Sequence, residues 1–272
     1  MLRGATGLLG SAHLEPSLAV SIAACALALG AGLGARTLMV ALAVGSGQLS
    51  IGWSNDWLDW RRDRAAGRRD KPVARDLIRP RTVAVSALVA LLLCVAASLA
   101  LSVAAGVVHL LAVAAGWFYN VRAKHTWYSV MPWALAFGLL PAVVTLTAPI
   151  SRWPAWWMLV AGAALGSGAH FANAIPDLER DRATGVTGLP HRLGRHRSLL
   201  ATLGLIAAGV VAIAAGSTVP AAAITVGGAA AVGLPMVTVA AHRGHDRAAF
   251  RGVVVLLVVL AVGMVASGTA LS

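Results

Sequence analysis

Long apolar runs separated by short polar segments dominate the chain, and they predict an all-α polytopic membrane protein. A helix needs roughly 17 to 25 mostly apolar residues to cross a bilayer. Nine segments meet this requirement, at about 17–35, 36–54, 82–102, 103–120, 127–148, 154–173, 197–216, 218–241 and 250–270. The pattern therefore predicts one transmembrane domain over residues 1–272, a bundle of nine helices.

The polar connections between these segments predict the topology. Connections after the first, third, fifth and seventh segments are short and nearly uncharged, whereas those after the second, fourth, sixth and eighth are basic. Of the 22 Lys and Arg residues, 20 fall on the second side, and only Arg36 and Arg152 fall on the other. Because Lys and Arg accumulate in cytoplasmic loops, we expect a bacterial-type cell membrane, a cytoplasmic N-terminus and a C-terminus outside.

Composition supports a membrane location and argues against a nucleic-acid partner. Charged residues make up 12% of the chain, against about a quarter in soluble domains. The net charge of +12 is explained by the bias of the loops, so we expect no nucleic-acid partner. Cys25 and Cys94 lie in separate apolar runs and show no disulfide or metal-binding spacing. The N-terminal stretch lacks signal-peptide features and is interpreted as a short cytoplasmic lead.

One polar pattern, N-x-x-x-D-x-x-x-D-R-A-x-G, occurs twice. The first box is NDWLDWRRDRAAG at 55–67, and the second box is NAIPDLERDRATG at 173–185. Each follows an even-numbered apolar segment, and four segments separate them, so both boxes have the same orientation. This spacing indicates a parallel duplication, with halves at about 17–120 and 127–241 and a ninth helix at 250–270 left over. We expect the two boxes to face each other across one cavity, open to the cytoplasm.

The helical period of about 100° per residue gathers the polar side chains of each box on one side of its helix. The two sets are Asn55, Asp56, Asp59 and Asp63, and His170, Asn173, Asp177 and Asp181. Carboxylates that share a site repel each other. Mg²⁺ relieves this repulsion, because it binds through one or two carboxylates together with substrate phosphates.

Basic residues near the boxes can neutralise the phosphate oxygens that a metal leaves free. The candidates are Arg61, Arg62, Arg64, Arg68, Lys71, Lys124, Arg182 and Arg192. We single out Arg64, Lys71, Lys124, Arg182 and Arg192 as diphosphate-binding residues. The sequence thus predicts a magnesium–diphosphate site at the cytoplasmic ends of the helices, above an apolar cavity.

Such a site suits the ionisation of an allylic isoprenoid diphosphate. Metal and cationic side chains make diphosphate a good leaving group, and a water-poor cavity protects the carbocation that remains. Aromatic faces can stabilise that cation. Possible contacts to the prenyl chain or to its acceptor are Trp57, Tyr119 and His170.

These motifs carry a resemblance to a known family. NDWLDWRRD resembles the N-D-x-x-D-x-x-x-D box of the UbiA superfamily of intramembrane prenyltransferases, and Asp177 and Asp181 match its second box. WFYNVRAKHTW and GVTGLPHRLG are similar to two further family segments, and the resemblance covers nearly the whole chain. It implies a prenyl diphosphate donor, a small hydrophobic or aromatic acceptor, and Mg²⁺. The implied metal–diphosphate residues are Asn55, Asp56, Asp59 and Asp63 with Asn173, Asp177 and Asp181.

Two other functions remain open on the sequence. A terpene cyclase would ionise the same donor and let the cation attack its own double bonds. A secondary transporter would share the repeats and a charged cavity, but its binding site would lie near the bilayer midplane. The transferase is the first hypothesis, with Asp56, Asp59, Asp63, Asp177 and Asp181 as catalytic residues.

Overall fold

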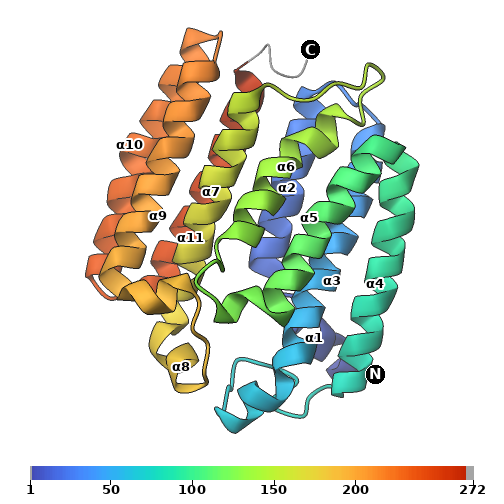
Figure 1. The fold of residues 1–272 in the computed structure, drawn as a ribbon, viewed down its shortest axis with the longest axis vertical. Coiled ribbons are helices and arrows are strands. Elements are labelled where there is room, and N and C mark those ends of the chain that lie inside the picture. The colour runs from blue at the N-terminus through green and yellow to red at the C-terminus, as the bar shows by residue number, and fades with distance from the viewer. Residues whose placement is uncertain (1, 268–272) are drawn as a thin grey trace.

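The computed structural model describes residues 2–267, and within that range the chain is all-helical without a strand. Helices stand side by side along the long axis of the molecule (Figure 1). Their bounds are α1 Leu2–Gly10, α2 Leu14–Gly30, α3 Arg36–Ala65, α4 Pro80–Leu101, α5 Val103–Val121, α6 Met131–Thr145, α7 Trp156–Ala174, α8 Leu178–Ala183, α9 Leu189–Gly216, α10 Pro220–His242 and α11 Asp246–Ala266. Two 3₁₀ turns, Ala123–His125 and Ile175–Asp177, join α5 to α6 and α7 to α8.

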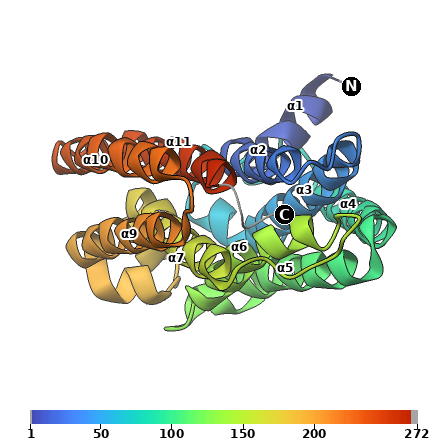
Figure 2. The same ribbon diagram turned by 90° about the horizontal axis from the view of Figure 1, so that it is seen from above.

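The long helices form a closed ring. Each of them packs against the next along the chain, and α11 packs against α2. Seen from above, α10, α11 and α2 form one row, which faces a second row containing α9, α7, α6 and α5 (Figure 2). Many large apolar side chains face outward, such as Leu38, Leu92 and Ile224, each more than 69% exposed. This arrangement fits a bundle that is surrounded by lipid rather than by water.

The all-helical fold is confirmed, whereas nine membrane spans are not. Every predicted segment overlaps a long helix, but among residues 2–267 only six helices are long and apolar enough to cross a membrane by length and composition. The helices α2 and α6 are apolar but shorter, and the polar residues and first box in α3 lower its hydropathy. The predicted lead contains a helix, α1, and part of 250–270 lies outside the described residues. The internal repeat of two four-helix halves remains a prediction.

The two boxes end in the same backbone turn, which explains the final glycine of the repeated pattern. Gly67 (φ +63°) and Gly185 (φ +82°) adopt the left-handed conformation that closes a helix C-terminus. The amide that follows each glycine donates to the carbonyl of the last aspartate, from Arg68 to Asp63 at 3.0 Å and from Val186 to Asp181 at 2.9 Å. The glycine therefore turns each chain back toward the site.

The boxes differ in the helices that carry them. The first box is continuous with α3, a single helix of 30 residues. The second contains Pro176, which lacks the amide hydrogen needed for a regular helix. As a result α7 ends at Ala174, and a 3₁₀ turn and the six-residue α8 follow it.

Candidate active site

A polar cavity of about 600 Å³ lies between the two boxes. Asn55, Asp59 and Asp63 line it from the first box, and Asn173, Asp177 and Asp181 line it from the second. Its lining carries six carboxylates and six cationic side chains, the latter being Arg62, Arg68, Lys71, Lys124, Arg247 and Arg251. The lining of the cavity is thus rich in charged groups, and its negative and positive charges nearly cancel. The expectation that the boxes face each other is confirmed by this placement.

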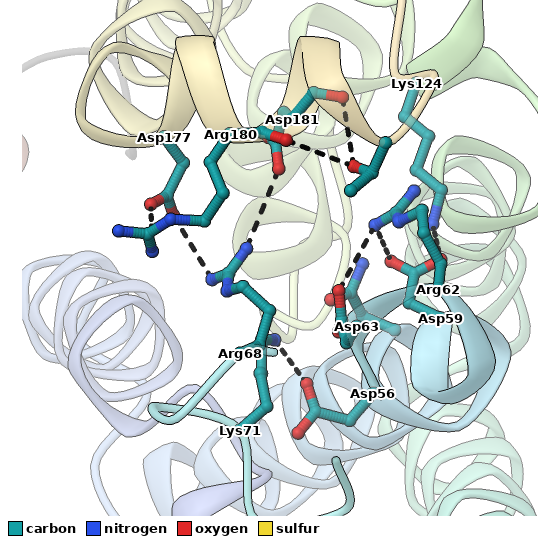
Figure 3. Close-up of polar contacts among 12 residues, drawn as sticks. Asp56, Asp59, Arg62, Asp63, Arg68, Lys71, Lys124, Asp177, Arg180 and Asp181 are labelled. Atoms are coloured by element: carbon teal, nitrogen blue, oxygen red, sulfur yellow. Dashed lines mark hydrogen bonds and ion pairs between the residues drawn. The ribbon is translucent and has the colours of Figure 1, made fainter. Parts of the chain in front are cut away.

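Cationic side chains neutralise the carboxylates of the first box (Figure 3). Lys124 donates to one oxygen of Asp59 at 2.5 Å, and Arg62 donates to the other at 2.7 Å. Asp59 and Asp63 are 7% and 4% exposed. Burial raises the pKa of Asp63, and the neighbouring Asp59 raises it further. Burial lowers the pKa of Lys124, and the charge of Asp59 opposes that shift.

Arg68 links the first box to the second. It comes directly after the glycine turn, it is 9% exposed, and its guanidinium lies 3.4 Å from Asp177 and 3.7 Å from Asp181. The same guanidinium donates to Asp70 at 2.7 Å. The hydrogen bond from Arg68 holds the pKa of Asp70 below its usual value. A buried arginine with several carboxylate partners keeps its charge, and it holds the loop against the second box.

Asp56 does not line the polar cavity itself, although two of its partners do. It is 1% exposed and is not part of the cavity lining. Its carboxylate accepts from Lys71 and lies 3.0 Å from the His13 imidazole, which is itself 2.8 Å from the Lys71 ammonium. Burial alone would raise the pKa of Asp56, but the His13 hydrogen bond and the Lys71 charge hold it below its usual value. Asp56 therefore holds Lys71 and His13, which do line the cavity.

Two further spaces adjoin the polar cavity and share lining residues with it. A side chamber of about 180 Å³ lies among α2, α3, α5 and α6, and it shares His13, Asn55, Tyr119 and Asn173 with the polar cavity. An apolar branch of about 80 Å³ lies among α2, α6, α7 and α11, and it shares Pro16 and Phe250 with the polar cavity. Trp133 and Phe137 line both spaces and separate them.

The structure brings together most, though not all, of the residues singled out in the sequence. Lys71, Lys124 and Tyr119 line the polar cavity. His170 is buried beneath it, where it lies 3.0 Å from the Ser129 hydroxyl and edge-on to Tyr119. Trp57 packs on a small core of Val73, Ile78 and Val83.

Three arginines are placed outside the cavity lining. Arg64 pairs with Asp76 at 2.5 Å, Arg182 donates to the His191 carbonyl, and Arg192 donates to the Thr187 carbonyl. Arg64 and Arg182 each follow the last aspartate of a box, so the helical period turns them away from the side that carries Asn55 or Asn173. Arg62 and Arg68 occupy the cavity in their place.

Sequence reasoning also missed His13 and Gln48, which line the side chamber. Gln48 precedes Asn55 by seven residues, so the helical period places both on one stripe of α3. That spacing could have identified it. His13 precedes α2 with a left-handed backbone (φ 49°), and no sequence pattern marks such a position.

The described residues hold no group of three or more His, Cys, Asp or Glu side chains arranged as a metal site. The donor set nevertheless fits a metal that shares its ligands with a substrate. Asp59 and Asp63 on one wall and Asp177 and Asp181 on the other offer carboxylate oxygens to a single cavity. Mg²⁺ commonly takes one or two carboxylates and completes its shell with phosphate oxygens and water.

Solved structures of similar fold include several UbiA homologs. An apo UbiA homolog from Aeropyrum pernix K1 has a TM-score of 0.75 at 18% identity, covering 91% of this chain and 97% of its own. A UbiA homolog from Archaeoglobus fulgidus bound to GPP and Mg²⁺ has a TM-score of 0.64 at 20% identity, covering 77% of each chain. A structure of digeranylgeranylglyceryl phosphate synthase has a TM-score of 0.70 at 13% identity, covering 98% and 99%.

These identities establish a shared fold and leave the chemistry of this chain to its own residues. No curated protein matches the sequence. The model of the UbiA prenyltransferase family matches residues 17–256, which is most of the chain. The match includes both boxes, the loop with Lys124 and ten of the eleven α-helices in whole or part. With its six long apolar helices, the protein is an integral membrane protein that belongs to the UbiA prenyltransferase family.

Proposed function

We propose that the protein transfers a prenyl group from an isoprenoid diphosphate to a small acceptor, with Mg²⁺ bound between the two boxes. One observation carries the proposal: two matching boxes of carboxylates line one polar cavity, and an apolar branch adjoins it. The Archaeoglobus fulgidus homologs bound to GPP or DMAPP with Mg²⁺ are consistent with this chemistry. Orientation with the cavity toward the cytoplasm follows from the Lys and Arg bias of the loops.

Binding of the donor would exchange ion-pair partners within the cavity. Asp59, Asp63, Asp177 and Asp181, with the amides of Asn55 and Asn173, would hold the metal. Arg62, Arg68, Lys71 and Lys124 already point into the cavity, so they can turn from carboxylate to phosphate oxygens. Arginine suits this exchange because its planar fork binds carboxylate and phosphate with the same geometry. The bound metal supplies positive charge to the leaving diphosphate.

The reaction breaks the bond between the first carbon of the prenyl chain and the diphosphate oxygen, and the electron pair leaves with the diphosphate. The cationic side chains stabilise the charge that develops on the leaving oxygens. A new bond then forms between the prenyl carbon and a carbon of the acceptor, which loses one proton to the released diphosphate. Tyr119, Trp133 and Phe137 offer aromatic faces to the side chamber, where they can stabilise the cation.

The test measures diphosphate release by the purified protein in nanodiscs. Dimethylallyl, geranyl, farnesyl and geranylgeranyl diphosphates are offered with Mg²⁺ or with EDTA, in each case with a membrane lipid extract as the source of acceptor. We expect release that EDTA abolishes and that Asp59→Asn lowers at least 100-fold. Asp76→Asn, which removes an exposed carboxylate outside the cavity, serves as the matched control. Binding of a donor without any release, under conditions where the protein is folded, would contradict the proposal.

The mass of the product separates transfer from cyclisation. A transferred product contains the atoms of the acceptor, whereas a cyclised hydrocarbon or alcohol contains only the prenyl chain and water. Substrate movement across proteoliposomes without chemical change would instead support a transporter.

A further inference from the structure

We infer that Thr187 and Gly188, in the loop after the second box, are positioning residues for Lys124, the cation that pairs with the first box. The inference rests on the proposed function and gives a loop outside the two boxes a role in it. It is carried by the hydrogen bonds between the second-box loop (residues 184–188) and the lysine loop (residues 122–130), by the lack of room for a side chain at Gly188, and by the burial of Lys124.

Lys124 needs support from a neighbouring segment because it lies in a loop rather than in a long helix. The helix α5 ends at Val121 and α6 begins at Met131, with a 3₁₀ turn, Ala123–His125, between them. Lys124 is nevertheless 5% exposed, and its ammonium donates to Asp59 at 2.5 Å (Figure 3). A lysine side chain is a point charge on a flexible stem. Its backbone must therefore be held in place for the ammonium to stay on one oxygen.

Hydrogen bonds between the two loops supply this support. The Thr187 hydroxyl donates to the His125 carbonyl at 2.7 Å. The His125 imidazole donates to the Gly185 carbonyl at 3.2 Å. At the start of α9, the amide of Leu189 donates to the Ser129 hydroxyl at 2.8 Å. These three bonds join the loops, and two of them involve the residue that directly follows the lysine.

Gly188 allows the two backbones to touch. A Cβ at this position would lie 2.7 Å from the Lys124 carbonyl oxygen and 3.0 Å from the Ser129 hydroxyl. The backbone of Gly188 has an ordinary negative φ of −58°, so the glycine is not required for its conformation. It is required because the backbone of Lys124 lies where a side chain would be.

The second-box loop is itself fixed to the second box and to α9. The amide of Val186 donates to the Asp181 carbonyl at 2.9 Å. Arg192, on α9, donates to the Thr187 carbonyl at 2.8 Å. Support for Lys124 therefore runs from the second box, through its loop, to the lysine loop.

The links between the two boxes thus cross. Arg68 follows the first box and reaches the carboxylates of the second at 3.4 and 3.7 Å. Lys124 is held by the loop of the second box and reaches a carboxylate of the first. Thr187 and Gly188 do not line the polar cavity. A displaced second-box loop would still reduce the positive charge that faces the leaving diphosphate, because it would move Lys124.

The first measurement uses the two lysines of the chain, Lys71 and Lys124. Selective ¹³C-lysine labelling of the full chain in nanodiscs gives one set of side-chain signals from each, and Lys124→Arg assigns them. In Gly188→Ala and in Thr187→Val, the Lys124 signals should shift while the Lys71 signals stay in place. Thr187 is exposed, so its replacement leaves the core intact. Thr187→Ser, which keeps the hydroxyl, should retain the wild-type spectrum.

The second measurement is Mg²⁺-dependent diphosphate release from the donor that the wild type ionises fastest. Gly188→Ala should lower kcat about tenfold and change the KM for the donor less than about twofold, because charge develops on the leaving oxygens in the transition state. Thr187→Val should lower kcat about threefold, since one exposed hydrogen bond is lost. In a Lys124→Met background, neither change should cost more than about twofold. Gly204→Ala, in the middle of α9 with open space around it, is the control and should change neither the spectrum nor kcat.

Unchanged Lys124 signals in both variants, or equal costs of Gly188→Ala with and without the lysine, would overturn the inference. The two measurements also separate it from the proposed function. Release by the wild type together with unshifted Lys124 signals would keep the proposed function and refute the positioning role. Shifted Lys124 signals without release from any donor would refute the proposed function, and the contact between the loops would stand.

Discussion

The two boxes share a motif and a terminal glycine turn, yet they provide different environments. Side chains of the first-box carboxylates Asp56, Asp59 and Asp63 are 1%, 9% and 6% exposed, and they lie on one unbroken helix with Lys124 and Arg62 against Asp59. Side chains of Asp177 and Asp181 are 29% and 22% exposed, and Pro176 interrupts the helix beneath them. One wall of the site is therefore fixed by its own cations, and the other is more open to water.

This difference implies that the first box positions the second. Arg68 follows the first box but binds the carboxylates of the second, so the more open wall is positioned by the more rigid one. Removing one partner of a buried charge pair costs more free energy than removing one partner of an exposed pair. We therefore expect the two boxes to tolerate the loss of a carboxylate to different degrees.

The largest effect should come from Asp59→Asn compared with Asp177→Asn. The first change leaves Lys124 buried beside a neutral group and removes a metal ligand, so diphosphate release should fall by about 10²–10³-fold. The second removes a ligand from a wetter wall, where a water molecule can replace it, and should cost about tenfold less. Initial rates at saturating donor and Mg²⁺ measure both. Equal losses would remove the distinction between the walls.

Arg68→Ala should have the next largest effect, since it cuts the link between the boxes. The KM for the donor should rise about tenfold, because Asp177 and Asp181 lose the cation that holds them and the diphosphate loses a partner. In the double variant with Asp177→Asn, the two costs should not add, which indicates direct coupling. Arg69→Ala, at an exposed neighbouring position, is the matched control. Additive costs in the double variant would contradict the coupling.

Gly67→Ala and Gly185→Ala test the shared turn. Each places a Cβ in the left-handed conformation, which should lower the free energy of unfolding by about 1–2 kcal/mol. Thermal unfolding in detergent measures this cost. The effect on activity should be greater for Gly67→Ala, because Arg68 and Lys71 follow that turn. Gly204→Ala, in the middle of α9 with open space around it, should not destabilise the protein; a loss there would point to a general sensitivity to Cβ groups.

The smallest effect concerns Asp63 in the ligand-free protein. Burial raises its pKa above the ordinary 3.8, so its ionised form costs stability at neutral pH. Asp63→Asn should raise the midpoint of thermal unfolding at pH 7. This gain should vanish as the pH falls below the ordinary pKa of 3.8, because the Asp63 carboxyl is then neutral in both the folded and the unfolded protein. Activity should fall at the same time. A lower midpoint at pH 7 would show that Asp63 stabilises the apo protein.

The helices and the two boxes could be predicted from the sequence more completely than the cationic side chains that pair with the boxes. Apolar runs and the repeated motif are local signals, so the helices and the opposed aspartates could be predicted. Distance along the sequence favours Arg64 over Arg68, because Arg64 directly follows the last aspartate of the first box. The glycine turn reverses that order in space, since it brings Arg68 back to the cavity and leaves Arg64 on the outside. The pairing of Asp56 with Lys71 and His13 depends on three separate segments, which no helical period can reveal.

The contact between α2 and α11 has a consequence for biosynthesis. These are the first and last long helices of the ring, and Pro16 and Phe250 contribute walls to the same cavity. A ribosome-bound chain that has already inserted both boxes would still lack one side of its reaction chamber. The protein would therefore be able to enclose a reactive carbocation only after α11 has been synthesised, at the end of translation. A chain that stops before Asp246 should integrate into the membrane and yet fail to retain a prenyl diphosphate analogue.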